Sequence, residues 1–380
     1  MKLVGYFFHM PETSPPPDAL VALIDDARAR WVFTAVGLIV AVDGELVFEH
    51  HAGTTRAWDA PGRPAASRGL PVDEQTRFDL ASVTKPIVAT ALLAELDARG
   101  LTADLPVREL LPEFTKPGLA DITVAQLLSH TAGFPAEWFD REPDPAARRF
   151  RLGARPDAPA GGIHRYSCVG YIWAGLALET LAGMPLDEVV SRRVLRPLGM
   201  VDSGYRPEAG ARDTIAATEH QPGRGLVQGE VHDETAWALG GVSGNAGLFG
   251  TARDLLRFAE AIRTGGMLDG ERVLPEHVVR QLTTAREVPA DSGGDGHSGG
   301  DQPDYRQALG LRLDEPWMRG LGPVTAGHTG FTGTAFVTEP GGRRSVVFLT
   351  NRVHPTRSST ELLAMRGPVI DAAARLGGQP

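Results

Sequence analysis

The most informative segment of the sequence is residues 78–85, Phe78-Asp79-Leu80-Ala81-Ser82-Val83-Thr84-Lys85. The apolar segment after it predicts a helix that starts near Ser82 and ends at Arg99-Gly100, where glycine is a good stop. Positions i and i+3 share one side of a helix, so the Ser82 hydroxyl and the Lys85 amine can lie within hydrogen-bonding distance. Serine becomes nucleophilic when a neighbouring base takes its proton, and an amine can do this if burial or nearby charge lowers its pKa. The pair therefore predicts a serine nucleophile with an amine beside it.

Ser82 also has a plainer interpretation. A serine near a helix start is commonly an N-cap, whose hydroxyl accepts a hydrogen bond from the backbone. The backbone N–H of Ser82 would lie at the positive end of the same helix and could help to hold an oxyanion. Because S-x-x-K is a short pattern, the rest of the chain has to decide between these two roles.

Strand-like segments lie at both ends of the chain and helical segments lie in the middle. The expected elements are helix Asp18–Arg30, strands Phe33–Val42 and Leu46–His50 around the turn Asp43-Gly44, helical segments Val107–Leu111, Val124–Leu128, Tyr171–Leu181 and Leu186–Leu198, strands Gly330–Thr338 and Ser345–Thr350, and helix Ser359–Leu376. This order predicts an α/β (α+β) fold with an antiparallel sheet. We expect one domain from residues 18–80 and 241–380, and a mostly helical domain from residues 81–240 that carries the nucleophile helix.

Composition limits the classes of function. The net charge of −9 argues against nucleic acid or an anionic membrane surface as the main partner, because both need clustered Lys and Arg. No apolar run approaches the roughly 20 residues that span a bilayer. The apolar start of the chain stops at His9 and is shorter than the ~7–15-residue hydrophobic region of a signal peptide. With Cys168 as the single cysteine, we expect a cytoplasmic protein without an intrachain disulfide.

Six motifs in a consistent order carry a resemblance to a known family. They are Phe78–Lys85, Leu127–Pro135 (Leu-Leu-Ser-His-Thr-Ala-Gly-Phe-Pro), Tyr166–Tyr171 (Tyr-Ser-Cys-Val-Gly-Tyr), Pro197–Met200 (Pro-Leu-Gly-Met), Gly241–Thr251, and Gly327–Thr334 (Gly-His-Thr-Gly-Phe-Thr-Gly-Thr). In these motifs, from roughly Phe33 to Val353, the chain resembles the serine β-lactamase/penicillin-binding-protein superfamily. Within it, the chain is most similar to class C β-lactamases and family VIII carboxylesterases. The resemblance implies a β-lactamase/transpeptidase-like fold.

The resemblance also implies roles for particular residues. Ser82 would be acylated, and Lys85 would serve as the general base or share that role. Tyr166 would relay protons to the leaving group and activate the deacylating water; because a phenol titrates near ~10, it needs cationic neighbours such as Lys85. The backbone N–H groups of Ser82 and Phe331 would form the oxyanion hole, with Phe331 on an edge strand that starts near Gly330. Without the motifs around it, Tyr166 would be taken for a core tyrosine.

Two departures from the family pattern concern the substrate. Cys168, His328, Thr329 and Gly330 occupy the substrate-binding positions that the resemblance implies. His328 stands where the family usually has a lysine, and a histidine is mostly neutral at pH 7 unless its environment shifts it. Cys168 stands where the family has an asparagine, and a thiol donates and accepts hydrogen bonds only weakly. Both departures favour small neutral esters over carboxylate-bearing β-lactams or D-alanyl peptides.

Other patterns are weaker as candidate sites. Gly296–Gly300 fits G-x-S-x-G, but it lies in a polar loop without the strand and helix that a nucleophile elbow requires. His50-His51 and His232-Asp233-Glu234 lack zinc-ligand spacing, so surface or supporting roles are the default, and no metal is expected. No dinucleotide or Walker motif is present, so we expect no cofactor.

The expected function is a serine hydrolase that acts on a small-molecule ester or amide, most simply a carboxylesterase. A β-lactamase, a D,D-peptidase or an acyltransferase would share the same acyl-enzyme. An inactive ligand-binding homologue is the non-enzyme alternative, and the joint presence of Ser82, Lys85 and Tyr166 argues against it. The sequence leaves the acyl group and the oligomeric state open.

Overall fold

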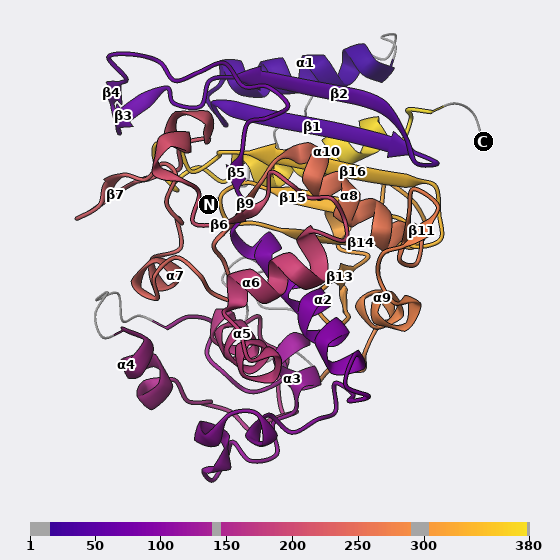
Figure 1. The fold of residues 1–380 in the computed structure, drawn as a ribbon. Coiled ribbons are helices and arrows are strands. Elements are labelled where there is room, and N and C mark those ends of the chain that lie inside the picture. The colour runs from indigo at the N-terminus through magenta and orange to yellow at the C-terminus, as the bar shows by residue number, and fades with distance from the viewer. Residues whose placement is uncertain (1–15, 139–145, 290–303, 378–380) are drawn as a thin grey trace.

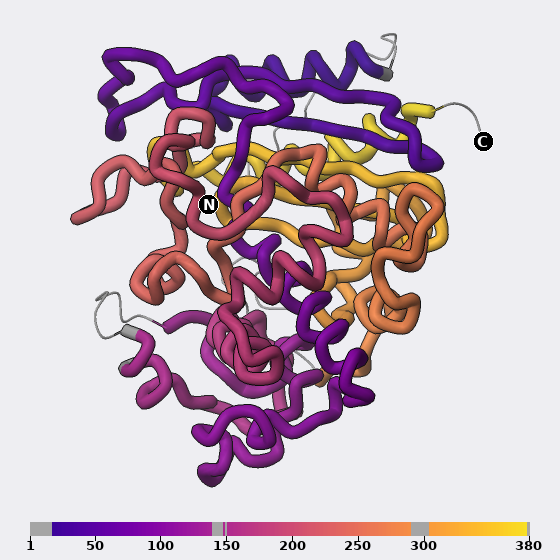
Figure 2. Tube along the Cα trace, in the orientation of Figure 1, coloured from indigo at the N-terminus to yellow at the C-terminus, as the bar shows by residue number. Residues whose placement is uncertain are grey.

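A computed structural model describes residues 16–138, 146–289 and 304–377. Its largest sheet has the strand order β12–β13–β14–β15–β16–β1–β2, and all neighbouring strands are antiparallel. In that order, the strands are Arg306–Gln307, Arg312–Leu313, Ala326–Thr329, Ala335–Thr338, Arg344–Thr350, Ala35–Val42 and Glu45–Gly53. The sheet therefore combines strands from both ends of the chain, and Figure 2 shows indigo and yellow segments side by side.

Helices cover both faces of this sheet (Figure 1). The helices are α1 (Pro16–Ala29), α2 (Thr84–Asp97), α3 (Val124–Leu128), α4 (Ala146–Gly153), α5 (Cys168–Ala182), α6 (Leu186–Val190), α7 (Glu234–Ala238), α8 (Ala252–Arg263), α9 (Glu276–Thr283) and α10 (Glu361–Ala373). Strand β1 is buried along its whole length and alternates between two cores. Val36, Leu38 and Val40 pack with α1 and α10, whereas Ile39 packs in the larger core with α2, α5 and α8.

Smaller elements complete the fold. The short sheets are β5 (Phe78–Asp79) with β9 (Leu248–Gly250) and β6 (Gly204–Tyr205), β3 (Trp58–Ala60) with β4 (Arg63–Pro64), β7 (His220–Gln221) with β8 (Gly225–Leu226), and β10 (Met267–Leu268) with β11 (Glu271–Arg272). The remaining turns of helix are η1 (Ala81–Val83), η2 (Val107–Glu109), η3 (Pro112–Thr115), the π-helical η4 (Ser191–Leu195), η5 (Ala209–Thr214) and η6 (Pro316–Met318). The β5–β9–β6 sheet fixes the segment that leads into the nucleophile.

The predicted mixed fold with an antiparallel sheet is confirmed, as is the hairpin around Asp43-Gly44. Both turn residues adopt positive φ, 53° and 87°, as a two-residue hairpin turn requires. The helix that follows the nucleophile begins at Thr84, so Ser82 lies in the preceding turn η1. The division into two domains stays a prediction.

The strand predicted over Gly330–Thr338 is wrong in its first half. Residues 330–334 form a tight turn, in which Gly330 N–H donates to Thr334 O (2.7 Å) and Gly333 N–H donates to Gly330 O (3.0 Å). Strand β15 begins only at Ala335. Phe331 therefore lies in a turn and not on an edge strand, and β14 before it lies between β13 and β15.

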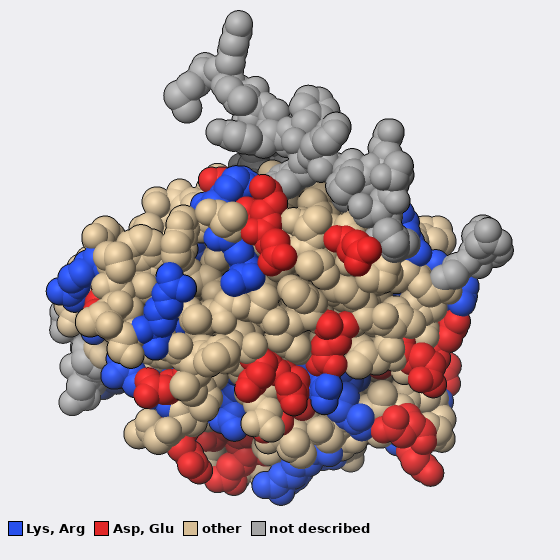
Figure 3. All heavy atoms as spheres, turned by 90° about the horizontal axis from the view of Figure 1, so that it is seen from above, with Lys and Arg blue, Asp and Glu red and all other residues tan. Residues whose placement is uncertain are grey.

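Among the described helices, none alone has the length and apolar composition to cross a membrane. Helix α5 and residues Leu186–Leu195 meet that test only as a pair bent by 80°. On the face that includes α1, acidic and basic side chains are interspersed (Figure 3).

Candidate active site

The segment that precedes Ser82 is held by its pairing with strand β9. Strand β5 pairs with β9 through Phe78–Gly250 and Asp79–Phe249, and Leu80 N–H donates to Leu248 O (2.9 Å). Ala81 then adopts φ +47°, a left-handed conformation that is uncommon for residues with a Cβ. Ser82 follows in η1, where the first N–H groups of a helical turn lack acceptors within the helix. The segment thus presents both the hydroxyl and the backbone of Ser82 at the start of α2.

Lys85 joins three segments of the chain at this point. Its Nζ lies 2.8 Å from Ser82 Oγ, 3.1 Å from the carbonyl oxygen of Asn245 and 3.4 Å from Cys168 Sγ. The side chain is fully buried, and three acceptors match the three N–H groups of an ammonium. The i, i+3 spacing seen in the sequence therefore produces direct contact with the nucleophile.

The charge on Lys85 follows from its neighbours. Burial by itself lowers the pKa of Lys85, but the Cys168 thiol and the Tyr166 phenol raise it, and the net direction is upward. The amine therefore holds its proton at neutral pH in the resting site. Of the two roles that the resemblance implies for Lys85, this direction argues against that of sole general base.

Tyr166 is flanked by two cations. Lys85 Nζ lies 4.8 Å from its ring centroid, and the guanidinium carbon of Arg312 lies 4.9 Å from it. The His130 ring packs against it at a centroid distance of 4.6 Å. Arg312 belongs to β13, is largely buried and pairs with Glu315 at 3.0 Å. The sequence interpretation missed this second cation.

His328 is neutral in this environment. It is buried in β14, and its Nδ1–H donates to the carbonyl oxygen of Thr329 (2.8 Å). Burial, followed by the positive charges of Arg312 and Lys85, holds the pKa of His328 well below its usual value. A neutral ring therefore stands in the place of the family's lysine, and the positive charge nearby belongs to Arg312.

The turn that carries Phe331 is attached directly to the nucleophile segment. Thr334 Oγ1 donates to Leu80 O (3.0 Å), and Thr332 Oγ1 donates to Asp79 O (2.7 Å). Gly330 permits this approach, because a Cβ there would lie 2.5 Å from Leu80 O and 2.1 Å from Thr334 Oγ1. The two predicted oxyanion-hole residues therefore come from turns that are in contact.

Cys168 is the first residue of α5, and Ser167 caps that helix by accepting the N–H of Gly170. Burial raises the pKa of the Cys168 thiol. A neutral thiol 3.4 Å from the Lys85 amine fits the predicted substrate-binding position and does not have the lowered pKa of a reactive cysteine.

The predicted site residues lie together, and some of them are accessible to solvent while others are buried. Ser82, Tyr166, Cys168, Thr329 and Phe331 keep part of their surface exposed, whereas Lys85, His328 and Gly330 are buried. The reactive groups are thus reachable, and the groups that hold them are not.

The weaker sequence patterns have different outcomes in the structure. Within the described ranges, no group of three or more His, Cys, Asp or Glu side chains could hold a metal ion. The G-x-S-x-G pattern at Gly296–Gly300 lies outside the described residues. His51 pairs with Glu49 on β2, whereas His232 is buried beside Phe331.

Comparison with known proteins defines the class. The beta-lactamase family model matches residues 20–366, so the chain belongs to this family and is a serine hydrolase. It is 28% identical over 376 residues to the Escherichia coli (strain K12) protein named "Putative D-alanyl-D-alanine carboxypeptidase", covering 86% of this chain and 81% of that one.

Two solved structures show the same fold. A family VIII carboxylesterase superposes with a TM-score of 0.72 at 20% identity, covering 95% of this chain and 97% of that one. A class C beta-lactamase also gives a TM-score of 0.72, at 18% identity, covering 96% and 97%. Within the family, the relatives therefore differ in substrate, and the substrate of this chain has to be argued from its own site.

Proposed function

We propose that this chain hydrolyses small uncharged esters through an acyl-enzyme on Ser82. The observation that carries the proposal is the contact between the buried Lys85 Nζ and Ser82 Oγ, 2.8 Å long, beside the ring of Tyr166. Together these residues supply a nucleophile and a neighbouring group that can exchange protons, which acyl transfer requires.

In the acylation step, Ser82 Oγ attacks the carbonyl carbon of the ester and a C–O bond forms. Because Lys85 already holds its proton, the proposed step starts from a deprotonated Tyr166 oxygen, which takes the Ser82 proton and becomes a neutral phenol between Lys85 and Arg312. The oxyanion is held by the N–H groups of Ser82 and Phe331. When the bond between the acyl carbon and the alcohol oxygen of the ester breaks, the Tyr166 phenol gives the proton to the leaving alcohol.

Deacylation reverses these roles with water as the nucleophile. Water gives a proton to the Tyr166 oxygen and attacks the acyl carbon, and the same two N–H groups hold the second oxyanion. Ser82 Oγ then leaves with the proton, which restores the resting site. An alcohol in place of water would give acyl transfer through the same step.

The uncharged-ester preference rests on the two substituted positions. His328 is neutral because it is buried beside two cations, so it offers no charge to a substrate carboxylate. Cys168 offers weak hydrogen bonding where an amide would hold an acylamino group. Arg312 is already paired with Glu315 and lies against the Tyr166 ring, which leaves it partly neutralised.

Arg312 nevertheless favours a second candidate, a D,D-peptidase. Its guanidinium lies beside Tyr166, and its positive charge lowers the pKa of His328. It could therefore take over the role of the family's lysine and hold a substrate carboxylate by two parallel hydrogen bonds. The name of the Escherichia coli relative points to the same substrate class.

A substrate profile on three proteins separates these functions. Wild type, Ser82→Ala and Arg312→Gln are compared on p-nitrophenyl esters, nitrocefin and D-alanyl peptides, together with labelling by a fluorophosphonate probe. We expect ester turnover and labelling in wild type, both lost in Ser82→Ala. Faster cleavage of D-alanyl peptides than of esters, abolished by Arg312→Gln, would establish the second candidate instead. Higher turnover with an added alcohol would show acyl transfer.

A further inference from the structure

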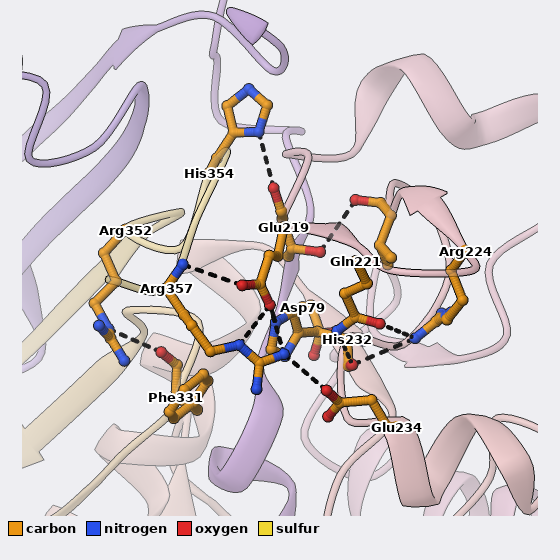
Figure 4. A network of polar contacts seen from close by, with 12 residues as sticks. Asp79, Glu219, Gln221, Arg224, His232, Glu234, Phe331, Arg352, His354 and Arg357 are labelled. Carbon is orange, nitrogen blue, oxygen red and sulfur yellow. Dashed lines mark hydrogen bonds and ion pairs between the residues drawn. The ribbon is translucent and has the colours of Figure 1, made fainter. Parts of the chain in front are cut away.

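A second polar cluster lies against the turn that carries Phe331 (Figure 4). We call it the support cluster, and its members are Asp79, Glu219, His232, Arg352 and Arg357. They come from β5, from the segments before β7 and α7, and from the chain after β16. None of them takes part in the proton transfers described above.

The support cluster encloses the side chain of Phe331. The His232 ring stacks on the Phe331 ring with centroids 5.6 Å apart and an interplanar angle of 28°. The guanidinium carbons of Arg352 and Arg357 lie 4.8 and 5.4 Å from the same ring centroid. Arg352 Nε also donates to the carbonyl oxygen of Phe331 (2.9 Å). Both the ring and the backbone of Phe331 are therefore held.

The same cluster holds the nucleophile segment through Asp79. One carboxylate oxygen accepts the backbone N–H of His232 (2.6 Å), and the other accepts the N–H of Ala81 (2.8 Å). Ala81 is the residue with φ +47°, directly before Ser82. A conformation of this kind costs free energy and persists only where neighbouring groups impose it.

Fixed charges hold His232 itself in place. Its Nε2 donates to Glu219 (3.0 Å), which also accepts from Arg357 Nε (2.6 Å), while Arg357 pairs with Glu234 (2.8 Å). Burial opposes the ionisation of Glu219, but the hydrogen bonds from His232 and Arg357 lower its pKa to about 2. The carboxylate is therefore charged at any physiological pH.

From this geometry we infer that the support cluster positions the oxyanion hole, with His232 as a link between its two halves. The backbone of His232 is bonded to the carboxylate that fixes Ala81, and its ring lies against Phe331. His232 thereby adds a second connection between the segment that carries the N–H of Ser82 and the turn that carries the N–H of Phe331, beside the hydrogen bonds of Thr332 and Thr334. The inference rests on the proposed function, in which these two N–H groups hold the oxyanion.

The test compares wild type with His232→Gln, Arg352→Gln and Arg352→Lys. Steady-state kinetics on a p-nitrophenyl ester should show kcat reduced by about 10²-fold in both glutamine variants, with KM changed by less than about threefold, because lost oxyanion stabilisation acts on the transition state. Affinity for a phenylboronic acid, which forms a tetrahedral anion on Ser82, should fall in parallel. Arg352→Lys keeps a donor and a charge and should recover part of kcat.

Amide hydrogen exchange of peptides that cover residues 79–83 and 329–334 gives a readout that needs no activity. Exchange should accelerate in both peptides of His232→Gln, and not in a peptide from α8. The matched control is His354→Gln, a buried histidine whose ring bonds to Thr218, Ala57 and Trp58 instead.

Several outcomes would overturn the inference. One is amide exchange in His232→Gln that stays at the wild-type rate, and another is an equal acceleration in His354→Gln. A third is a rise in KM at unchanged kcat in the two glutamine variants His232→Gln and Arg352→Gln. If wild type neither labels with fluorophosphonate nor turns over esters, the proposed function fails, and the exchange measurement still decides whether the cluster couples the two turns.

Discussion

Two regions meet at Ser82 and differ in whether their charged groups exchange protons or stay in fixed ion pairs. On the side of α2 and α5, Ser82, Lys85, Tyr166 and Cys168 have one ammonium among groups that exchange protons or stay neutral. On the side of Phe331, the support cluster contains the guanidinium groups of Arg352 and Arg357 and the carboxylate of Glu219, whose pKa is lowered to about 2.

The difference follows from what each region has to do. A group that passes a proton in each step must have two protonation states of similar free energy, so fixed strong ion pairs would hinder it. A group that only holds backbone in place gains from an ion pair that no pH change near neutrality can break. We therefore expect substitutions in the first region to lower kcat strongly. Substitutions in the second region should lower kcat less and should also lower the free energy of unfolding.

Tyr166→Phe should cause the largest change after loss of the nucleophile. Removing the phenol oxygen removes the proton acceptor, and we expect kcat for a p-nitrophenyl ester to fall by about 10²–10⁴-fold. Tyr171→Phe is the control, because it removes a nearby buried phenol that donates to Leu128 O (2.9 Å). Near-normal kcat in Tyr166→Phe would return the role of base to Lys85 alone.

Gly330→Ala should come next, since it acts on the contact between the two regions. The added methyl group would lie 2.5 Å from Leu80 O and must push the turn away from the nucleophile segment. We expect kcat to fall by about 10²-fold through the displaced oxyanion hole. Gly204→Ala, where an added Cβ meets nothing within 4 Å, should keep wild-type kinetics. Normal activity in Gly330→Ala would show that the close approach is not needed.

Acid should destabilise the second region, because Glu219 is held there as a carboxylate. The pKa of Glu219 is about 2 in the folded chain and about 4.3 when unfolded. Its stabilisation is therefore complete above about pH 4.3 and is lost as the pH falls toward 2. In urea unfolding, Glu219→Gln should be less stable than wild type at pH 7 and should lose less stability over that acid range. Glu260→Gln, which breaks the separate buried pair with Arg263, is the control; parallel acid profiles in wild type and Glu219→Gln would contradict the assignment.

Cys168→Asn should have the smallest effect. An amide at this position can donate and accept where the thiol does so weakly, and one good hydrogen bond is worth about 1 kcal/mol, or about fivefold. We expect the ratio of kcat/KM for an acylamino ester to that for a plain ester to rise by about that factor. Cys168→Ala should leave the ratio unchanged; an equal rise there would assign the effect to pocket size.

The sequence predicted the parts of the site that depend on local spacing. Ser82 and Lys85 are three residues apart, so helical geometry alone brings them together, and the resemblance to a family supplied Tyr166 and Phe331. The strand predicted through Phe331 failed because its composition favours a strand while Gly330 and Gly333 allow a turn, with Gly333 at φ 109°.

Contacts between segments that are far apart in the sequence could not be predicted from local spacing. Arg312 reaches Tyr166 because the two-residue strand β13 pairs Arg312 with Gly327, and no sequence pattern gives that register. His232 was noticed as part of a polar triplet, but its partners Asp79 and Glu219 are 153 and 13 residues away along the chain. Such pairings depend on the completed fold.

Strand β1 has a consequence for how the chain reaches that fold. It lies between β2, which follows it directly, and β16, which begins at Arg344. During synthesis, the apolar hairpin of β1 and β2 therefore lacks one neighbour until most of the chain has been made. Pairings of such high sequence separation form slowly and leave an open strand edge in the meantime. The hairpin is thus a segment that gains from protection against aggregation while the rest of the chain is being translated.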